Sequence, residues 1–140
     1  MTNETAMVSA DLIKEMITEE GYEVIDSGEG NIFHVRDVDA GLRITCALED
    51  NILFNTLPCF STAKANVNEA MMSSMLDAEN GISTSSFQLY DMPDGQVRVA
   101  LSNFCKLQDL GPDDHDDILS CIDFLLVDVV AAHSLLAEYV

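Results

Sequence analysis

The sequence contains little positive charge. Its 140 residues include 6 Lys and Arg against 25 Asp and Glu, which gives a net charge of −19 at pH 7. Phosphate backbones and anionic lipids repel so acidic a chain, so we expect neither nucleic acid nor a membrane surface as a direct partner. The acidity either keeps the protein soluble, steers basic proteins or an aggregation-prone client towards it, or mimics nucleic acid.

The start of the sequence does not predict a signal peptide. Met1 to Val8 has no basic segment and no apolar segment of the kind that secretion requires. The apolar stretch from Ile118 to Ala137 is long enough to cross a membrane, but it contains Asp123 and Asp128. Each ionisable group near the bilayer centre costs roughly 2.5–3.5 kcal/mol. We therefore expect a soluble, cytoplasmic protein.

The four cysteines include no C-x-x-C pair. Most of them stand among apolar neighbours, which favours free buried thiols over a disulfide framework or a zinc site. This pattern is typical of a protein in a reducing compartment.

No stretch of the sequence has a catalytic, cofactor-binding or metal-binding signature. Neither His34, His115 nor His133 belongs to a recognisable nucleophile motif, and the only G-x-G, at residues 28–30, lies between two expected strands. The segment at residues 37–41 lacks a ligand that a calcium loop needs, and compensation of a helix dipole explains the acidic run at residues 113–117. We expect no catalytic residue, no metal ligand and no cofactor.

Hydrophobic periodicity predicts three helices and six strands. The first helix follows Ser9 and stops near Gly21, and a hairpin turns at residues 27–31. Alternation predicts strands at residues 42–48 and 52–57, with Pro58 ending the second strand or placing it at a sheet edge. A helix from about Asn66 to Asn80-Gly81, a hairpin at residues 87–102, a connection at residues 104–110 and a long helix from Pro112 complete the chain.

This order predicts the α+β class. Hairpin-joined strands favour a mainly antiparallel sheet, and helices packed on it make two layers with the order α-β-β-β-β-α-β-β-α. At this length we expect one domain over residues 1–140, with residues 1–8 as a flexible arm.

The final helix carries two apolar faces. At 100° per residue, one face gathers Ile118, Ile122, Leu125, Val129 and Leu136, which we expect to pack on the sheet. A second face carries Phe124, Val127, Ala131 and Leu135. A helix that is apolar on both sides is usually buried on both sides. We expect this second face to form a homodimer interface; alternatively, the first or second helix covers it within the monomer.

Several of these features together resemble the type III secretion chaperone-like superfamily. They are the order of elements, the small acidic chain and the surplus of apolar surface. Leu57-Pro58, the second helix, residues 83–89 and the strand at residues 97–102 before an acid-capped helix are most similar to YbjN-like and YjfI-like bacterial proteins. The resemblance implies a dimeric or partner-binding domain without catalysis. Secretion chaperones hold an extended client over apolar patches and sheet edges, and the strand ending at Pro58 is a candidate edge.

Two hypotheses about function follow. The first is a non-enzymatic interaction module, chaperone-like or regulatory, that binds another protein or peptide through apolar surface. The alternative is a small-molecule-binding protein or an enzyme whose site is assembled only in three dimensions. A deep pocket in which His34, Arg36, Arg43 or Arg98 converge would favour the alternative.

Overall fold

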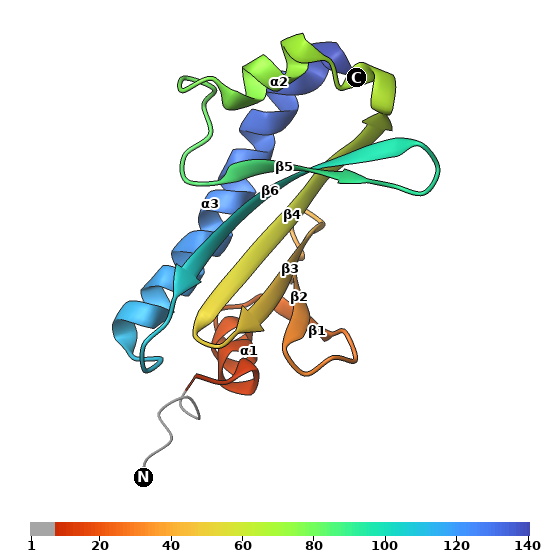
Figure 1. Ribbon diagram of the computed structural model, residues 1–140. Coiled ribbons are helices and arrows are strands. Elements are labelled where there is room, and N and C mark those ends of the chain that lie inside the picture. The colour runs from red at the N-terminus through yellow and green to blue at the C-terminus, as the bar shows by residue number, and fades with distance from the viewer. Residues whose placement is uncertain (1–7) are drawn as a thin grey trace.

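The computed structural model describes residues 8–140 and has one antiparallel sheet of six strands, in the order β1-β2-β3-β4-β6-β5. The order of helices and strands is the predicted one, and the α+β class is confirmed (Figure 1). The elements are α1 (Ala10–Glu19), β1 (Glu23–Asp26), β2 (Ile32–Asp37), β3 (Leu42–Glu49), β4 (Ile52–Ala63), α2 (Glu69–Leu76), β5 (Ser86–Asp91), β6 (Gln96–Lys106) and α3 (Pro112–Leu136). Short 3₁₀ helices, η2 (Lys64–Asn66) and η3 (Ala137–Tyr139), follow β4 and α3.

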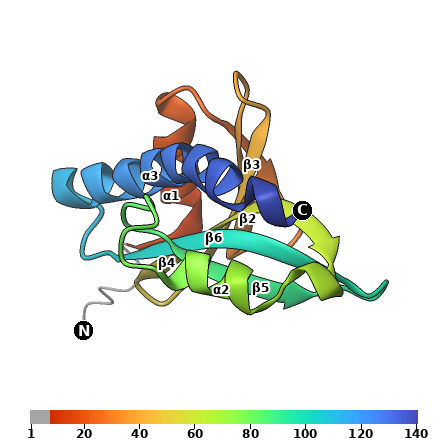
Figure 2. The same ribbon diagram turned by 90° about the horizontal axis from the view of Figure 1, so that it is seen from above.

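Helices α1 and α3 cover one face of the sheet (Figure 2). The strands send alternate apolar side chains to this face, where Phe33, Ile44 and Leu53 are fully buried with the helix residues Ile13 and Ile118. Helix α2 packs near the C-terminal end of α3, where Met71 and Met75 join a smaller apolar cluster. Alternation along the strands leaves polar and aromatic residues on the opposite face, which none of these helices covers.

Helix α3 packs on β4 and β6 with the apolar face that its periodicity predicts. That face is buried throughout: Ile118, Ile122, Leu125, Val129 and Leu136 are at most 2% exposed. By length and composition, the stretch Pro112–Tyr139 could span a membrane. In the fold one face of this helix packs in the core; solubility and a cytoplasmic location stay predictions.

Pro58 does not end a strand, but it does lie where one side of β4 is unpaired. Strand β4 continues to Ala63 between β3 and β6, but its pairing with β3 stops at Thr56, so Pro58 is paired only with Ala100 of β6. A β-bulge between Pro58 and Phe60 lets the chain accommodate proline, which has no N–H to donate to the ladder. The edge predicted at Pro58 is a local one, on the side of β4 that lies beyond the end of its pairing with β3.

Two expected boundaries also differ. Strand β6 extends to Lys106, so part of the expected connection at residues 104–110 is strand. Val8 is buried in the main apolar cluster and does not belong to a flexible arm; residues 1–7 lie outside the described residues.

Asp114 organises the loop that leads into α3. Its carboxylate is buried, and one oxygen accepts hydrogen bonds from the N–H groups of Gln108, Asp109 and Leu110 at 2.7, 3.0 and 2.8 Å. Leu110 has a φ of 57°, a backbone conformation that non-glycine residues rarely adopt. The acidic run at the helix start thus includes one residue that holds the preceding loop in its turn.

Replacing Asp114 by alanine should lower the free energy of unfolding by roughly 3 kcal/mol, because three backbone N–H groups lose a charged acceptor. Urea unfolding followed by circular dichroism measures the change. Asp113→Ala is the matched control, since Asp113 is exposed in the same helical turn; it should cost less than about 1 kcal/mol. Equal losses in the two variants would contradict the role given to Asp114.

Candidate functional site

The C-terminal end of β6 lacks a strand on one side. Its pairing with β5 stops at Ser86 and Ser102, whereas its pairing with β4 continues to Lys106. Residues 103–106 therefore have a strand neighbour only on the β4 side. On the N-terminal side of Ser86, the chain is no longer part of the sheet and forms the loop over α3.

The backbone groups that face this free side belong to Phe104 and Lys106. Leu107 donates its N–H to Asn51 O, on the β4 side, while Gln96 O accepts from Met92 N, on the β5 side. Successive residues of an antiparallel strand direct these groups to opposite sides, so the even-numbered residues of β6 face β5. Past Ser102, the N–H and C=O groups of Phe104 and Lys106 face no strand within residues 8–140.

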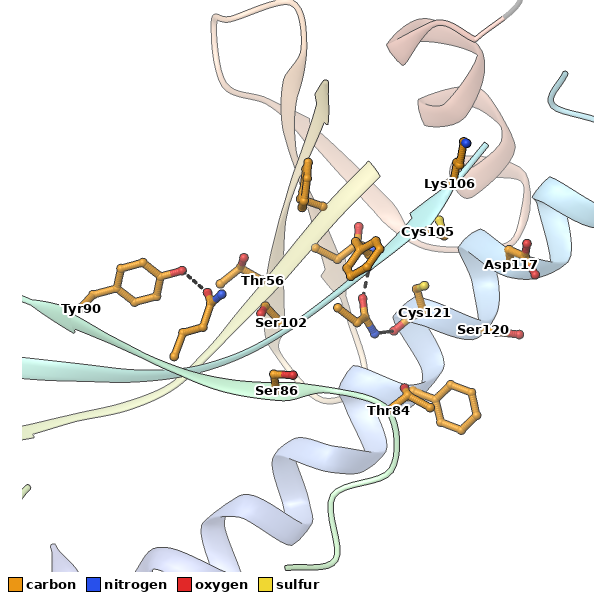
Figure 3. Close-up of a pocket in the computed structure, with 16 residues that line it drawn as sticks. Thr56, Thr84, Ser86, Tyr90, Ser102, Cys105, Lys106, Asp117, Ser120 and Cys121 are labelled. Atoms are coloured by element: carbon orange, nitrogen blue, oxygen red, sulfur yellow. Dashed lines mark hydrogen bonds between the residues drawn. The ribbon is translucent and has the colours of Figure 1, made fainter. Parts of the chain in front are cut away.

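A groove of about 820 Å³ runs along this free edge (Figure 3). We call it the β6 groove. Its aromatic walls come from Phe54 and Phe104, whose ring centroids lie 6.0 Å apart on neighbouring strands, and from Phe124 of α3. The remaining lining residues are Asn55, Thr56, Thr84, Ser86, Gln88, Tyr90, Ser102, Asn103, Cys105, Lys106, Asp117, Ser120 and Cys121.

Two asparagines form a polar chain within the groove. Asn55 Nδ2 donates to Asn103 Oδ1 at 3.1 Å, and Asn103 Nδ2 donates to the backbone oxygen of Cys121 at 2.9 Å. Asn55 is 1% exposed, and its Oδ1 has no hydrogen-bond partner within the described structure. Neither residue was expected to be functional from the sequence, although an asparagine at an inward position of an alternating strand is a usable signal.

Two thiols also line the β6 groove. The Cys105 S–H donates a hydrogen bond to the Cys121 sulfur, which lowers the pKa of Cys121 and raises that of Cys105. Burial raises the pKa of Cys59, outside the groove, to about 11. No histidine lines the groove beside either thiol, so the pair lacks the neighbouring base that cysteine nucleophiles use.

The residues proposed from the helical wheel divide into two environments. Phe124 and Val127 are 40% and 62% exposed, and Val130, which the wheel analysis did not select, is 65% exposed. Leu135 instead packs against the α2 cluster of Met71 and Met75, and Ala131 is half-buried. The dimer interface itself stays a prediction.

A second hollow, of about 590 Å³, lies on the uncovered face of the sheet. We call it the arginine hollow. It brings together His34, Arg43 and Arg98. These are three of the four residues whose convergence we expected to mark a small-molecule site. The fourth, Arg36, does not line it and instead pairs with Glu23 at 3.3 Å. The other lining residues are Thr45, Pro58, Cys59, Phe60 and Ser61.

Metal ligands do not cluster within the described part of the chain, residues 8–140: no group of three or more His, Cys, Asp or Glu side chains is placed to hold an ion. The segment Asp37 to Gly41 forms a turn, closed by a 2.8 Å hydrogen bond from Gly41 N to Asp37 O. The expectation that this segment is a turn is thereby confirmed.

No protein-family model matches the chain, and no curated protein matches it either. A solved structure with the same fold is that of YbjN from E. coli, described as "a putative transcription regulator". The two superpose with a TM-score of 0.67 over 91% of this chain and 93% of that chain, at 13% sequence identity. The chain therefore has a YbjN-like fold.

Proposed function

We propose that the protein is a non-enzymatic module, chaperone-like or regulatory, that binds another polypeptide as an added strand in the β6 groove. The observation that carries this proposal is the free edge at Phe104 and Lys106, which opens into an aromatic-lined groove. Unpaired N–H and C=O groups at a sheet edge are a template for another extended chain.

The geometry of the edge favours a peptide over a small molecule. Donors and acceptors repeat along β6 with the strand spacing of about 3.3 Å per residue, which an extended backbone matches. The free stretch spans four residues, Asn103–Lys106, or roughly 13 Å at that spacing. A short added strand would continue the position of β5 and place alternate side chains against the rings of Phe54 and Phe104.

The charge of the protein indicates the composition of the partner. The net charge of −19 attracts basic segments over a distance of about one Debye length, and Asp117 of α3 lines the groove itself. The preferred partner is an extended segment with apolar side chains at alternate positions and Lys or Arg at its flanks. A polypeptide-binding role also fits the regulatory description of YbjN.

Panning a library of random 12-residue peptides against the protein should enrich this composition. Binding of an enriched peptide should slow hydrogen exchange at the N–H groups of Phe104 and Lys106, because these groups gain a strand partner. Leu107 N–H already bonds to Asn51 O and should change little. Exchange measured by nuclear magnetic resonance with and without peptide gives the result residue by residue.

A matched pair of variants at Lys106 separates backbone from side chain. Lys106→Pro removes the outward N–H, whereas Lys106→Ala removes the side chain and keeps that N–H. Lys106→Pro should weaken peptide binding about tenfold or more through loss of a main-chain hydrogen bond, and Lys106→Ala should bind nearly as wild type. Wild-type affinity in a folded Lys106→Pro variant would rule out strand addition at this edge.

We also propose that the protein forms a homodimer through the exposed face of α3, with Phe124, Val127, Ala131 and Leu135 as interface residues. Support comes from the exposure of Phe124, Val127 and Val130 on a helix whose opposite side is buried. An apolar strip on an otherwise acidic protein is a typical association site, and a second copy supplies the same strip under two-fold symmetry. Leu135, partly packed on α2, lies at the margin of such an interface.

Val127→Asp should convert the dimer to a monomer at micromolar concentration, because each copy would bury an unpaired charge in place of an apolar side chain. Sedimentation velocity measures the change. Ser73→Asp is the control, since Ser73 is exposed on α2, away from the exposed face of α3; it adds the same charge and should stay dimeric. A monomeric wild-type protein in that range would eliminate the dimer, and it would leave the peptide-binding proposal to its own test.

A further inference from the structure

Four of the six Lys and Arg residues form no ion pair within residues 8–140: Arg43, Lys64, Arg98 and Lys106. Lys14 pairs with Asp26 at 2.8 Å, and Arg36 pairs with Glu23 at 3.3 Å. Within residues 8–140, Arg43 and Arg98 form no ion pair, although the chain carries 25 acidic residues. Both of them line the arginine hollow, and none of the residues that line it is acidic.

The strand order brings these two arginines to one place. Arg43 lies on β3 and Arg98 on β6, the two neighbours of β4 (Figure 1). Arg98 pairs in register with Ser61 of β4, and the bulge between Pro58 and Phe60 lies next to it. Bulges are frequent beside binding sites, because they redirect the chain and change which side chains face outward.

The placement of Arg43 is unfavourable for the sheet by itself. It lies directly opposite Arg36 in the β2–β3 register, with His34 also on β2. Like charges that face each other across strands destabilise a sheet. If this surface served only solubility, we would expect one of the many acidic residues at the position of Arg43. The adjacent positive charges instead favour the binding of an anion.

We propose that the arginine hollow binds an oxyanion group, the phosphate or carboxylate of a small molecule. The guanidinium groups of Arg43 and Arg98 present planar pairs of N–H donors that match oxyanion geometry. The hydroxyl of Ser61, which also lines the hollow, adds a neutral donor. Anion binding at this site would be a second function, separate from polypeptide binding.

His34 fits this site as a neutral donor. Its Nδ1 lies 3.1 Å from Thr45 Oγ1, which holds the ring against the neighbouring strand. Burial and the charge of Arg43 lower the pKa of His34 below its ordinary value, so the ring is mainly uncharged at neutral pH. A bound anion would offset the charge of Arg43. No acidic side chain lines the hollow to do so.

The arginine hollow and the β6 groove share no lining residue. The two sites can therefore be tested separately. Loss of anion binding would leave the peptide-binding proposal standing, and the reverse also holds.

The test titrates the full chain with inorganic phosphate and, separately, with succinate at constant ionic strength. Nuclear magnetic resonance follows the amides of Thr45 and Ser61 and the Nε–H signals of Arg43 and Arg98. Saturable shifts confined to these groups are expected. The anion that saturates at the lower concentration identifies whether phosphate or carboxylate is preferred.

Variants that each remove one positive charge make the test specific. Arg43→Gln and Arg98→Gln should each weaken binding about tenfold or more, because each removes charge-assisted hydrogen bonds. Arg36→Gln is the matched control: it removes the same charge from the same face but from an arginine already paired with Glu23, and it should change affinity less than about twofold. Thermal unfolding checks that the variants stay folded.

Three results would overturn the proposal. The first is shifts that rise linearly with both anions, which is nonspecific screening. The second is an equal loss in Arg36→Gln, which shows a general charge effect. The third is wild-type binding in folded Arg43→Gln and Arg98→Gln variants, which places any anion elsewhere.

Discussion

The packing of α3 on β4 and β6 is the contact on which both candidate sites depend. One apolar stripe of this helix is fully buried, and α1 covers the strands at the other end of the sheet. Two helices on one face leave the opposite face of six strands uncovered, and this face holds the arginine hollow. The N-terminal half of α3 also forms one wall of the β6 groove, because β5 ends before β6 does.

Periodicity was a reliable guide wherever a strand or helix is regular. It predicted the buried stripe of α3 and the hairpin of β5 and β6, because burial on one face imposes a repeat of about 3.6 or 2 residues. It failed at Pro58, where one extra residue changes the phase of β4. Before the bulge Leu57 faces the core; after it Phe60 and Thr62 do, which strict alternation from Leu57 does not predict.

The candidate sites depend on pairings between distant segments, so the sequence could indicate only some of their parts. The β6 groove exists because β5 has 6 residues and β6 has 11, and neither strand shows where their pairing stops. The arginine hollow requires β3 and β6 to flank β4, a strand order that no local pattern encodes. What the sequence did provide was the short set of basic residues from which Arg43 and Arg98 come.

The acidity of the protein acts on the two sites in opposite directions. A net charge of −19 draws a basic polypeptide towards the β6 groove but repels a small anion approaching the arginine hollow. Salt screens both long-range effects, with a Debye length of about 8 Å near 0.15 M. The contacts of the guanidinium groups are short-range and suffer less screening. Rising ionic strength should therefore slow peptide association while it eases entry of the anion, so the two sites respond to salt in opposite ways.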